Sequence, residues 1–208
     1  MGDVQESPTS RQAQRLRTRE RVLDAAIVEF QRAGAGSADI NAIVDAAGVA
    51  RSTFYFHFPT KEHVLLELMS RDEARLAEEL SRYLDTPHDL PAVLRTIVEL
   101  VLALESRWGA SLFRDVIGIY FSPFRLEDEQ WSKHPTFMLL AAEIERSRNR
   151  GELYDDVDAY YSAGFFLAGV HAALLTTARE ESARRHDVLK MFVRSSLRSL
   201  QRVSDSAP

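Results

Sequence analysis

The chain has 208 residues, contains no cysteine and carries a formal net charge of -5. This length can bury a substantial core, in one domain or in two small ones. The absence of cysteine excludes disulfides, thiolate nucleophiles and cysteine metal sites. The first residues lack the basic start and apolar run of a signal peptide, and the most apolar segment, residues 163–175, is shorter than the roughly 20 residues that span a bilayer. We therefore expect a cytoplasmic protein without membrane contacts.

Three regions are predicted along the chain: a mobile basic tail at residues 1–14, a first domain at residues 15–60 and a second domain at residues 61–203. Within residues 16–33, apolar side chains recur at helical spacing and predict an amphipathic helix with one buried face. The members of this apolar stripe are Val22, Leu23, Ala26, Ile27 and Phe30.

Residues 37–61 predict two short helices joined by a tight turn. The side chain of Ser37 or of Asp39 can cap the first helix by accepting a hydrogen bond from its free backbone N–H groups. Gly48 can end this helix, because glycine readily adopts the left-handed conformation found just past helix ends.

The second of these helices, about residues 51–58, has two different faces. Phe54 and Phe58 lie four residues apart on one side and can pack against the first helix. The opposite face is rich in hydrogen-bond donors and aromatic edges, which suits the DNA major groove, where a helix contacts base edges and phosphates. Its residues are Arg51, Ser52, Thr53, Tyr55, Phe56 and His57. Two helices joined by a glycine turn are typical of a helix-turn-helix unit, whose second helix is the reader.

The acidic net charge does not oppose this interpretation, because the charge is unevenly distributed. Residues 11–61 contain eight Lys/Arg and five Asp/Glu, which gives a local charge of +3. Charges are screened over about 8 to 10 Å at physiological salt, so the balance close to the phosphates is the relevant one.

The rest of the chain predicts six further helices. Pro91 suits the first turn of one helix. Asp155, Asp156 and Asp158 suit the N-terminus of another, where carboxylates complement the helix dipole, and this role is favoured over a metal site. The six helices are expected at about residues 61–84, 91–107, 110–121, 135–150, 155–179 and 183–202. The predicted fold class is therefore all-α, with about nine helices.

The segment at residues 160–175 is apolar almost all round, so a helix there needs burial on more than one side. A stripe of small residues along it would let a second helix approach closely. We expect this helix and the final helix to pair with their counterparts in a homodimer, which would also present two recognition helices about 34 to 36 Å apart, one turn of DNA. The predicted interface residues are Gly164, Ala168, Ala172, Val188, Phe192 and Ser196.

Residues 48–65, GVARSTFYFHFPTKEHVL, resemble the DNA-binding signature of the TetR family of transcriptional regulators, and residues 21–34 resemble the first helix of that family. The positions of the family pattern are occupied by Tyr55, His57, Phe58 and Lys61. Ala50 and Ser52 depart from the residues common in the family, which weakens any inference about the operator sequence but leaves the fold expectation intact.

The resemblance implies an N-terminal three-helix helix-turn-helix domain and a C-terminal ligand-binding and dimerisation domain. Such a protein would be a ligand-responsive regulator, most often a repressor, that binds a near-palindromic double-stranded DNA operator as a dimer and is released by a small apolar or aromatic effector. Arg51 is the best candidate for reading a guanine through O6 and N7, and Phe56 for contacting a thymine methyl group. The predicted DNA contacts are Thr18, Arg19, Arg51, Ser52, Thr53, Tyr55, Phe56, His57 and Lys61. Among them, the residues that suit phosphate oxygens, which fix register but carry little sequence information, are Thr18, Arg19, Thr53, Tyr55, His57 and Lys61. For Tyr55 and His57, simple packing or capping is the alternative.

A ligand pocket is implied within the helices of the second domain. Its candidates are aromatic residues and one histidine, and for any single one of them core packing is the alternative. The histidine could also bond a partner helix in a dimer. These candidates are Trp108, Phe113, Tyr120, Trp131, Phe137, Tyr161, Phe165 and His171.

Two other classes of protein are disfavoured. An enzyme could use His186-Asp187, a dipeptide found in helical metal phosphohydrolases, but no HxxxH pair, glycine-rich phosphate loop or GxSxG accompanies it. A helical protein-interaction scaffold would leave the polar face of residues 51–61 unexplained. No catalytic residue, cofactor or metal site is therefore expected.

Overall fold

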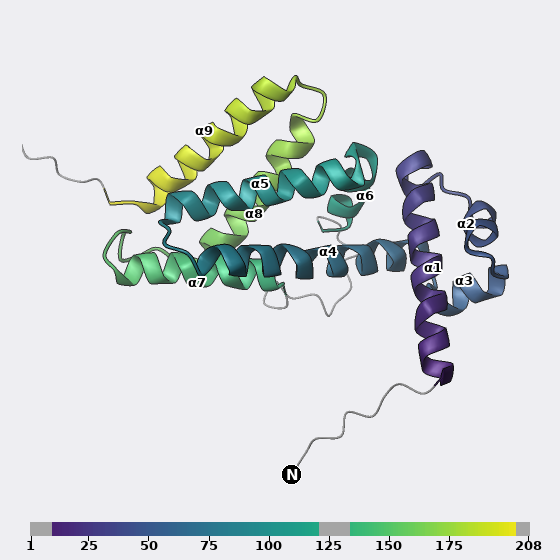
Figure 1. Ribbon diagram of the computed structural model, residues 1–208. Coiled ribbons are helices and arrows are strands. Elements are labelled where there is room, and N and C mark those ends of the chain that lie inside the picture. Colours follow the sequence, from purple (N-terminus) through teal and green to yellow (C-terminus); the bar gives the residue numbers. More distant parts are fainter. Residues whose placement is uncertain (1–9, 121–133, 203–208) are drawn as a thin grey trace, which may run out of the picture. The chain divides into compact units, whose positions relative to one another are not determined.

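The computed structural model describes residues 10–120 and 134–202, and the chain divides into two compact units, residues 1–69 and 70–208. The described residues form nine helices, together with an isolated β-bridge between Leu153 and Gln201 (Figure 1). The predicted all-α class is confirmed. The domain boundary expected at residue 60 lies at the start of α4 (Lys61–Leu84), a helix that contributes residues to both units.

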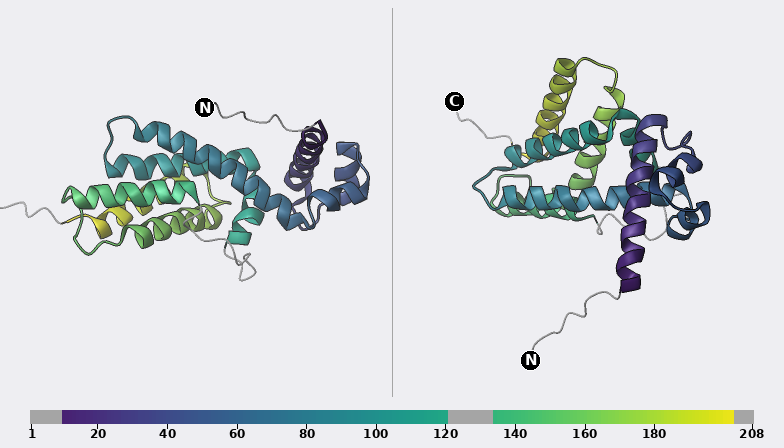
Figure 2. Two further views of the ribbon diagram at one scale, coloured as in Figure 1. Left: turned by 90° about the horizontal axis from the view of Figure 1, so that it is seen from below. Right: turned by 45° about the vertical axis from the view of Figure 1, so that its right-hand side comes forward.

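The first unit contains α1 (Ser10–Ala33), α2 (Ile40–Ala47), α3 (Arg51–His57) and the beginning of α4. Helix α1 packs along α2, and α2 is followed directly by α3 (Figure 2). Helix α1 begins earlier than predicted, so residues 10–14 are helical and do not belong to a tail. Residues 1–9 lie outside the described part of the chain.

Both ends of α2 are capped. The Asp39 side chain accepts a hydrogen bond from the Asn41 N–H at 2.8 Å, so Asp39 is the N-cap. Gly48 ends the helix with a positive φ of 62°, where a side chain would be strained. Arg21 of α1 donates to the Ala47 carbonyl through Nε at 3.2 Å, which satisfies a backbone acceptor that the helix end leaves free.

The core of the first unit joins all four helices. Phe54 and Phe58 are fully buried and lie with their ring centroids 6.2 Å apart, as their spacing predicts. Fixing these two rings fixes the rotation of α3, because seven residues make less than two turns of helix. The other core residues of this unit include Val22, Leu23, Ala26, Phe30, Ile43, Val44, Val64 and Leu68.

The second unit is built around α5 (Leu90–Trp108), which contacts each of the four helices that follow it in the chain. These are α6 (Ala110–Tyr120), α7 (Pro135–Asn149), α8 (Ala159–Thr176) and α9 (Ser182–Leu200). Two aspartates act as N-caps, Asp89 for α5 and Asp158 for α8. Of the three carboxylates predicted near the start of α8, Asp158 is therefore the one that caps it, by accepting from the Tyr161 N–H at 2.9 Å.

A buried carboxylate ties α4 to the end of α5. Asp72 is 2% exposed and accepts a hydrogen bond from Trp108 Nε1 at 2.7 Å. Arg75 and Arg107 also donate to this carboxylate, at 3.1 and 3.2 Å. A buried charge without such partners would be costly, so these bonds define how α4 meets α5.

Helix α8 leaves much of its apolar surface uncovered by the chain. Its length and composition would suit a membrane span, a test that core helices of soluble proteins also pass, but only 28% of it is buried. Tyr161 and Phe165, one turn apart, are 63% and 75% exposed. Helices α7 and α9 therefore cover α8 on one side only.

Candidate nucleic-acid interface

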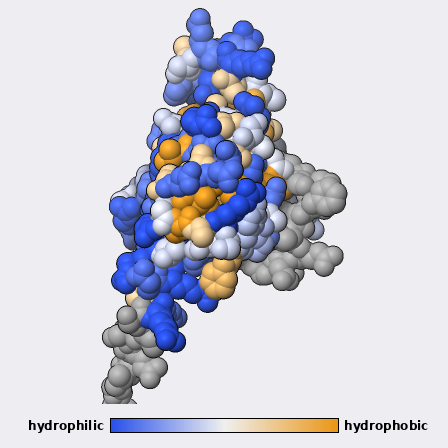
Figure 3. All heavy atoms as spheres, turned by 90° about the vertical axis from the view of Figure 1, so that its right-hand side faces the viewer, coloured by the Kyte–Doolittle hydropathy of each residue, from blue (hydrophilic) through white to orange (hydrophobic). Residues whose placement is uncertain are grey.

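The solvent-facing side of α3 carries the side chains predicted to contact DNA. Arg51, Ser52, Tyr55 and Phe56 are exposed, Phe56 by 64%, and Thr53 is half-buried. Hydrophilic side chains cover most of the face seen in Figure 3, with a small apolar area near its centre. Since Phe54 and Phe58 lock the helix from behind, these residues project from a rigid base.

The guanidinium of Arg51 is held by two neighbours. Its Nη1 donates to Asn41 Oδ1 at 3.0 Å, and its Nη2 donates to the Tyr55 hydroxyl at 3.4 Å. The guanidinium carbon also lies 5.7 Å from the centroid of the Tyr55 ring. Sequence reasoning does not identify Asn41, although its place in the first turn of α2, close to the recognition helix, is a usable signal.

The exposed Phe56 ring is covered in part by an arginine of α1. The guanidinium carbon of Arg15 lies 4.9 Å from the ring centroid, within the range of a cation–π contact. Thr18, predicted to contact phosphate, lies half-buried on the same helix. Basic and aromatic side chains of α1 and α3 therefore share one surface.

Arg19, predicted to contact DNA, makes several contacts within the first unit. Its guanidinium donates to the His57 carbonyl at 2.6 Å and to Glu67 Oε2 at 2.8 Å, and it lies 4.3 Å from the centroid of the Phe58 ring. Arg19 thus joins α1 to α3 and α4 within the unit.

His57 is 7% exposed, which agrees with packing, the alternative to a phosphate contact. Burial, and then the nearby cations of Arg19 and Arg15, lower the pKa of His57 below its ordinary value. The neutral imidazole is therefore favoured, and a cationic contact from His57 to phosphate is disfavoured.

Lys61, also predicted to contact DNA, bonds inside the unit through its ammonium group. Nζ donates to the carbonyls of Ala35, Gly36 and Ala38 at 3.1, 3.2 and 2.6 Å. An ammonium has three N–H donors, and these three acceptors account for all of them. Lys61 therefore anchors the loop between α1 and α2.

Glu29 holds the same loop from the other side. Its carboxylate accepts hydrogen bonds from Arg32 at 2.7 Å and from the Asp39 N–H at 3.0 Å. These two bonds, the Arg32 bond being the stronger influence, lower the pKa of Glu29 to about 2. The N-cap of α2 is consequently fixed by charged partners as well as by its own side chain.

The aromatic residues predicted to line a ligand pocket fall into two groups. Trp108 and Phe113 are buried with ring centroids 6.2 Å apart, and His171 lies 6.2 Å from Phe113. Burial lowers the pKa of His171 to about 4, although its hydrogen bond to the Leu167 backbone opposes the shift. The imidazole is therefore neutral at physiological pH and suits an apolar neighbour.

The second aromatic group runs from the core to the surface of α8. Phe137 is buried and its ring centroid lies 4.7 Å from that of Tyr160, and the rings of Tyr161 and Phe165 are stacked at 6.4 Å. Tyr161 and Phe165 are exposed in the single chain, and Phe165 lines an open groove. The side chain of Tyr120 and the whole of Trp131 lie outside the described residues.

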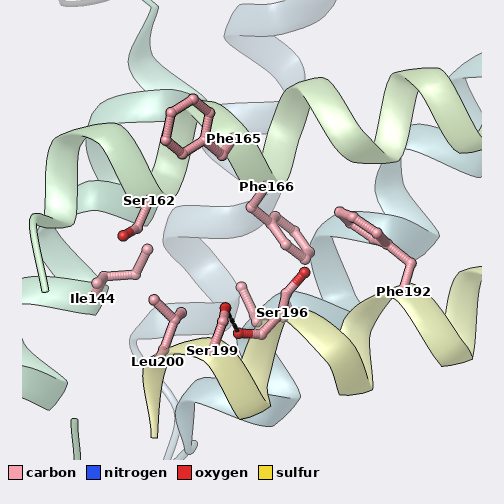
Figure 4. Close-up of a pocket in the computed structure, with 9 residues that line it drawn as sticks. Ile144, Ser162, Phe165, Phe166, Phe192, Ser196, Ser199 and Leu200 are labelled. Carbon is pink, nitrogen blue, oxygen red and sulfur yellow. Dashed lines mark hydrogen bonds between the residues drawn. The ribbon is translucent and has the colours of Figure 1, made fainter. Parts of the chain in front are cut away.

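A groove of about 180 Å³ opens beside Phe165, between α5, α7, α8 and α9 (Figure 4). The rings of Phe166 on α8 and Phe192 on α9 face each other beside Ser196, whereas the Phe165 ring points away from them. Ser199 Oγ donates to the Ser196 carbonyl at 2.7 Å. Ser196, predicted to contact a second copy, is therefore a lining residue of this groove.

Two other predicted interface residues pack within the chain. Phe192 is stacked on Phe166 at 5.5 Å and lies directly over Gly169, where an added Cβ would be only 2.3 Å from its ring. Gly164 faces the Phe137 ring. Ala168 and Val188 are half-buried, and Ala172 is exposed. Ala172, at the end of the predicted stripe of small residues, is therefore the member of the stripe that is exposed to solvent.

Within the described residues, no group of three or more His, Asp or Glu side chains could hold a metal ion. His186, of the dipeptide considered for an enzyme, bonds to the Ser182 carbonyl of its own helix at 2.8 Å.

The capped α2, the left-handed turn at Gly48 and the exposed face of α3 define a helix-turn-helix protein. The family model described as "Bacterial regulatory proteins, tetR family" matches residues 22–68. The crystal structure of Thermus thermophilus FadR, a TetR family transcriptional repressor in complex with lauroyl-CoA, is 26% identical and has a TM-score of 0.72, covering 91% of this chain and 98% of FadR. Residues 22–68 therefore match the DNA-binding region of the TetR family, and the fold of the chain is similar to that of a TetR family repressor.

Two curated regulators are similar to the N-terminal part of the chain. AcrR of Shigella flexneri is 37% identical over 90 residues, 43% of this chain and 41% of AcrR. The repressor KstR of Mycobacterium tuberculosis is 35% identical over 77 residues, 37% of this chain and 34% of KstR. The chain thus matches well under half the length of either relative.

Proposed function

We propose that this protein is a cytoplasmic transcriptional regulator, most simply a repressor, that binds a near-palindromic operator as a homodimer. The observation that carries the proposal is the exposed face of α3, with Arg51 held in place and Phe56 presented to solvent on a rigid base. Arg51 supplies the forked donor that suits guanine, and Phe56 an apolar contact for a thymine methyl group. Ser52, Thr53 and Tyr55 supply hydroxyl groups for phosphate or base edges.

The homodimer is supported by the uncovered face of α8 and α9. Tyr161, Phe165 and Met191 are each at least 60% exposed, an unusual surface for large apolar side chains. A second copy would bury this face by two-fold symmetry, and the symmetry would place one recognition helix in each half-site of the operator.

A small apolar effector is proposed to release the DNA by binding in the second unit. The aromatic cluster of Trp108, Phe113 and the neutral His171 offers an apolar lining. FadR, the similar structure described above, binds lauroyl-CoA, an acyl thioester. An effector with an apolar acyl chain is therefore the first to test.

Helix α4 provides the connection between effector and DNA. Its first residue, Lys61, bonds in the first unit, and Asp72, at the middle of the helix, bonds in the second unit. An effector that favours a dimer with wrongly spaced recognition helices needs only about 1 to 3 kcal/mol of coupling to weaken DNA binding 5- to 150-fold.

The test is selection from a pool of random duplex DNA at physiological salt, with sequencing of the bound fraction. We expect an inverted repeat to be enriched by the wild-type protein, and Arg51→Ala to lose the preference at one position of each half-site. The matched control is Arg95→Ala, which removes an exposed arginine of α5 in the second unit and should leave the selected sequence unchanged. No enrichment by wild-type protein refolded free of small molecules would refute the proposal.

A further inference from the structure

Asn41 lies in α2, outside the recognition helix, yet its side chain meets the residue proposed to read a base. Asn41 Oδ1 accepts a hydrogen bond from Arg51 Nη1 at 3.0 Å. The backbone N–H of Asn41 is itself held by the N-cap carboxylate of Asp39 at 2.8 Å. The amide oxygen is thus presented to Arg51 from a fixed point of α2.

A second contact restrains the same guanidinium from within α3. The Tyr55 hydroxyl lies 3.4 Å from Nη2 of Arg51, and the Tyr55 ring centroid lies 5.7 Å from the guanidinium carbon. A free arginine side chain samples many rotamers, and ordering it at an interface weakens binding. Restraint at both terminal nitrogens therefore orders Arg51 before DNA arrives.

The two restraints leave Arg51 able to read a base. A guanidinium has five N–H donors, and the bonds to Asn41 and Tyr55 use two of them. Guanine presents two acceptors in the major groove, O6 and N7, so the remaining three donors suffice. Lys61 differs, because its three donors are all used by backbone carbonyls.

We propose that Asn41 is a positioning residue for specificity: by orienting Arg51, it sharpens the preference for guanine at one position of each half-site. The inference rests on the proposed DNA-binding function. A purely structural role for Asn41 would change affinity for all sequences equally, whereas a positioning role changes the preference at the position that Arg51 reads.

The test repeats the selection from random duplexes with Asn41→Ala, Asn41→Asp and Arg51→Ala proteins. A bidentate arginine–guanine contact discriminates by about 5- to 150-fold. We expect Asn41→Ala to lower this preference by about 3- to 10-fold at the Arg51 position alone, with the other positions unchanged. The Asn41→Asp protein retains an acceptor for Arg51, so it should keep the preference while binding every sequence more weakly through repulsion from phosphate.

Two controls make the outcome decisive. Asn149→Ala, which removes the other asparagine of the chain, should change nothing. The double variant Asn41→Ala/Arg51→Ala should lose no more preference than Arg51→Ala, and circular dichroism should show that each variant is folded.

The inference and the proposed function fail in different ways. If wild-type protein selects a repeat and Asn41→Ala keeps the full guanine preference, or weakens all positions equally, the positioning role is overturned and the function stands. If wild-type protein selects no sequence, the proposed function fails and the inference is overturned with it.

Discussion

Replacing Lys61 with methionine distinguishes an internal anchor from a phosphate contact. Methionine preserves most of the apolar stem but removes the ammonium that donates to Ala35, Gly36 and Ala38. If the contacts in the structure define its role, Lys61→Met should destabilise the first unit and leave the salt dependence of DNA binding unchanged. If Lys61 instead neutralises a phosphate, Lys61→Met should leave the stability unchanged and reduce the salt dependence of DNA binding.

The size of the stability loss follows from the three carbonyls. Those of Ala35 and Ala38 are part-buried, whereas that of Gly36 is exposed and can be hydrated when the ammonium is gone. A hydrogen bond from a charged donor contributes about 1.5 to 3 kcal/mol when its partner would otherwise be left unsatisfied. Counting the two part-buried bonds, and allowing for some access of water to both, we expect a loss of about 2 to 4 kcal/mol.

The tryptophans make it possible to locate this loss. Residues 1–69 contain no tryptophan, and Trp108 is buried in the second unit, so tryptophan fluorescence reports on that unit, while far-UV circular dichroism reports on all helices. Lys61→Met should lower the urea concentration at which the first unit unfolds, as seen by circular dichroism. The midpoint of the fluorescence transition should stay unchanged. The control Lys190→Met, at an exposed position of α9, should shift neither transition.

The DNA measurement completes the comparison. Binding to the selected operator is measured at salt concentrations from about 50 to about 200 mM, at a temperature where the variant stays folded. A stability loss with an unchanged slope supports the anchor. An unchanged urea transition, together with a slope reduced by about 0.9 for one lost phosphate contact, would refute the reasoning.

Three further substitutions test the second unit. The pKa of His171 is about 4 in the folded chain, whereas its ordinary value is 6.5. As pH falls, the imidazole is therefore protonated first in the unfolded chain, which favours unfolding. Wild-type protein should lose about 3 kcal/mol of stability between pH 6.5 and pH 4 through this group. His171→Leu should lack this loss, and equal pH profiles would contradict the assignment. Gly169→Ala should destabilise the protein by about 1 to 2 kcal/mol, because the added methyl group clashes with Phe192. In a Phe192→Ala background the clash is absent, so Gly169→Ala should stabilise the protein by about 0.5 to 1 kcal/mol through the higher helix propensity of alanine. If a double-mutant cycle measured by urea unfolding shows no coupling between positions 169 and 192, this prediction is wrong. Phe165→Glu should weaken self-association at least about tenfold in sedimentation, because it would bury an unpaired charge, whereas Met138→Glu, at an exposed position of α7, should not.

The features that sequence alone predicted are those set by neighbours along the chain. Apolar spacing located the helices, and Asp39 and Gly48 marked the ends of α2, because capping depends on residues within one or two positions of the helix end. Phe54 and Phe58, four residues apart, had to share a face. The all-α class and the helix-turn-helix follow from such local rules.

The aromatic residues of the second unit show where local rules stop. Phe137, Tyr161 and Phe165 are similar in type and lie in apolar segments, yet the first is buried and the other two are exposed. Helical spacing says which residues share a face, but not which face a neighbouring helix covers. The approach of α7 and α9 to α8 decided that, as it decided that Gly169 must lack a side chain under Phe192.

Long polar side chains are the hardest to assign from sequence. Arg19 and Lys61 have the chemistry of phosphate ligands, but their charged ends reach acceptors that are 38 to 48 and 23 to 26 residues away in the chain. Asn41 reaches Arg51 in the same way, from another helix. Sequence determined that a basic, aromatic recognition helix would form, because helix formation and capping are local. Only the tertiary structure decided that Arg19 and Lys61 bond within the first unit, because a flexible side chain bonds to whatever the fold brings within its reach.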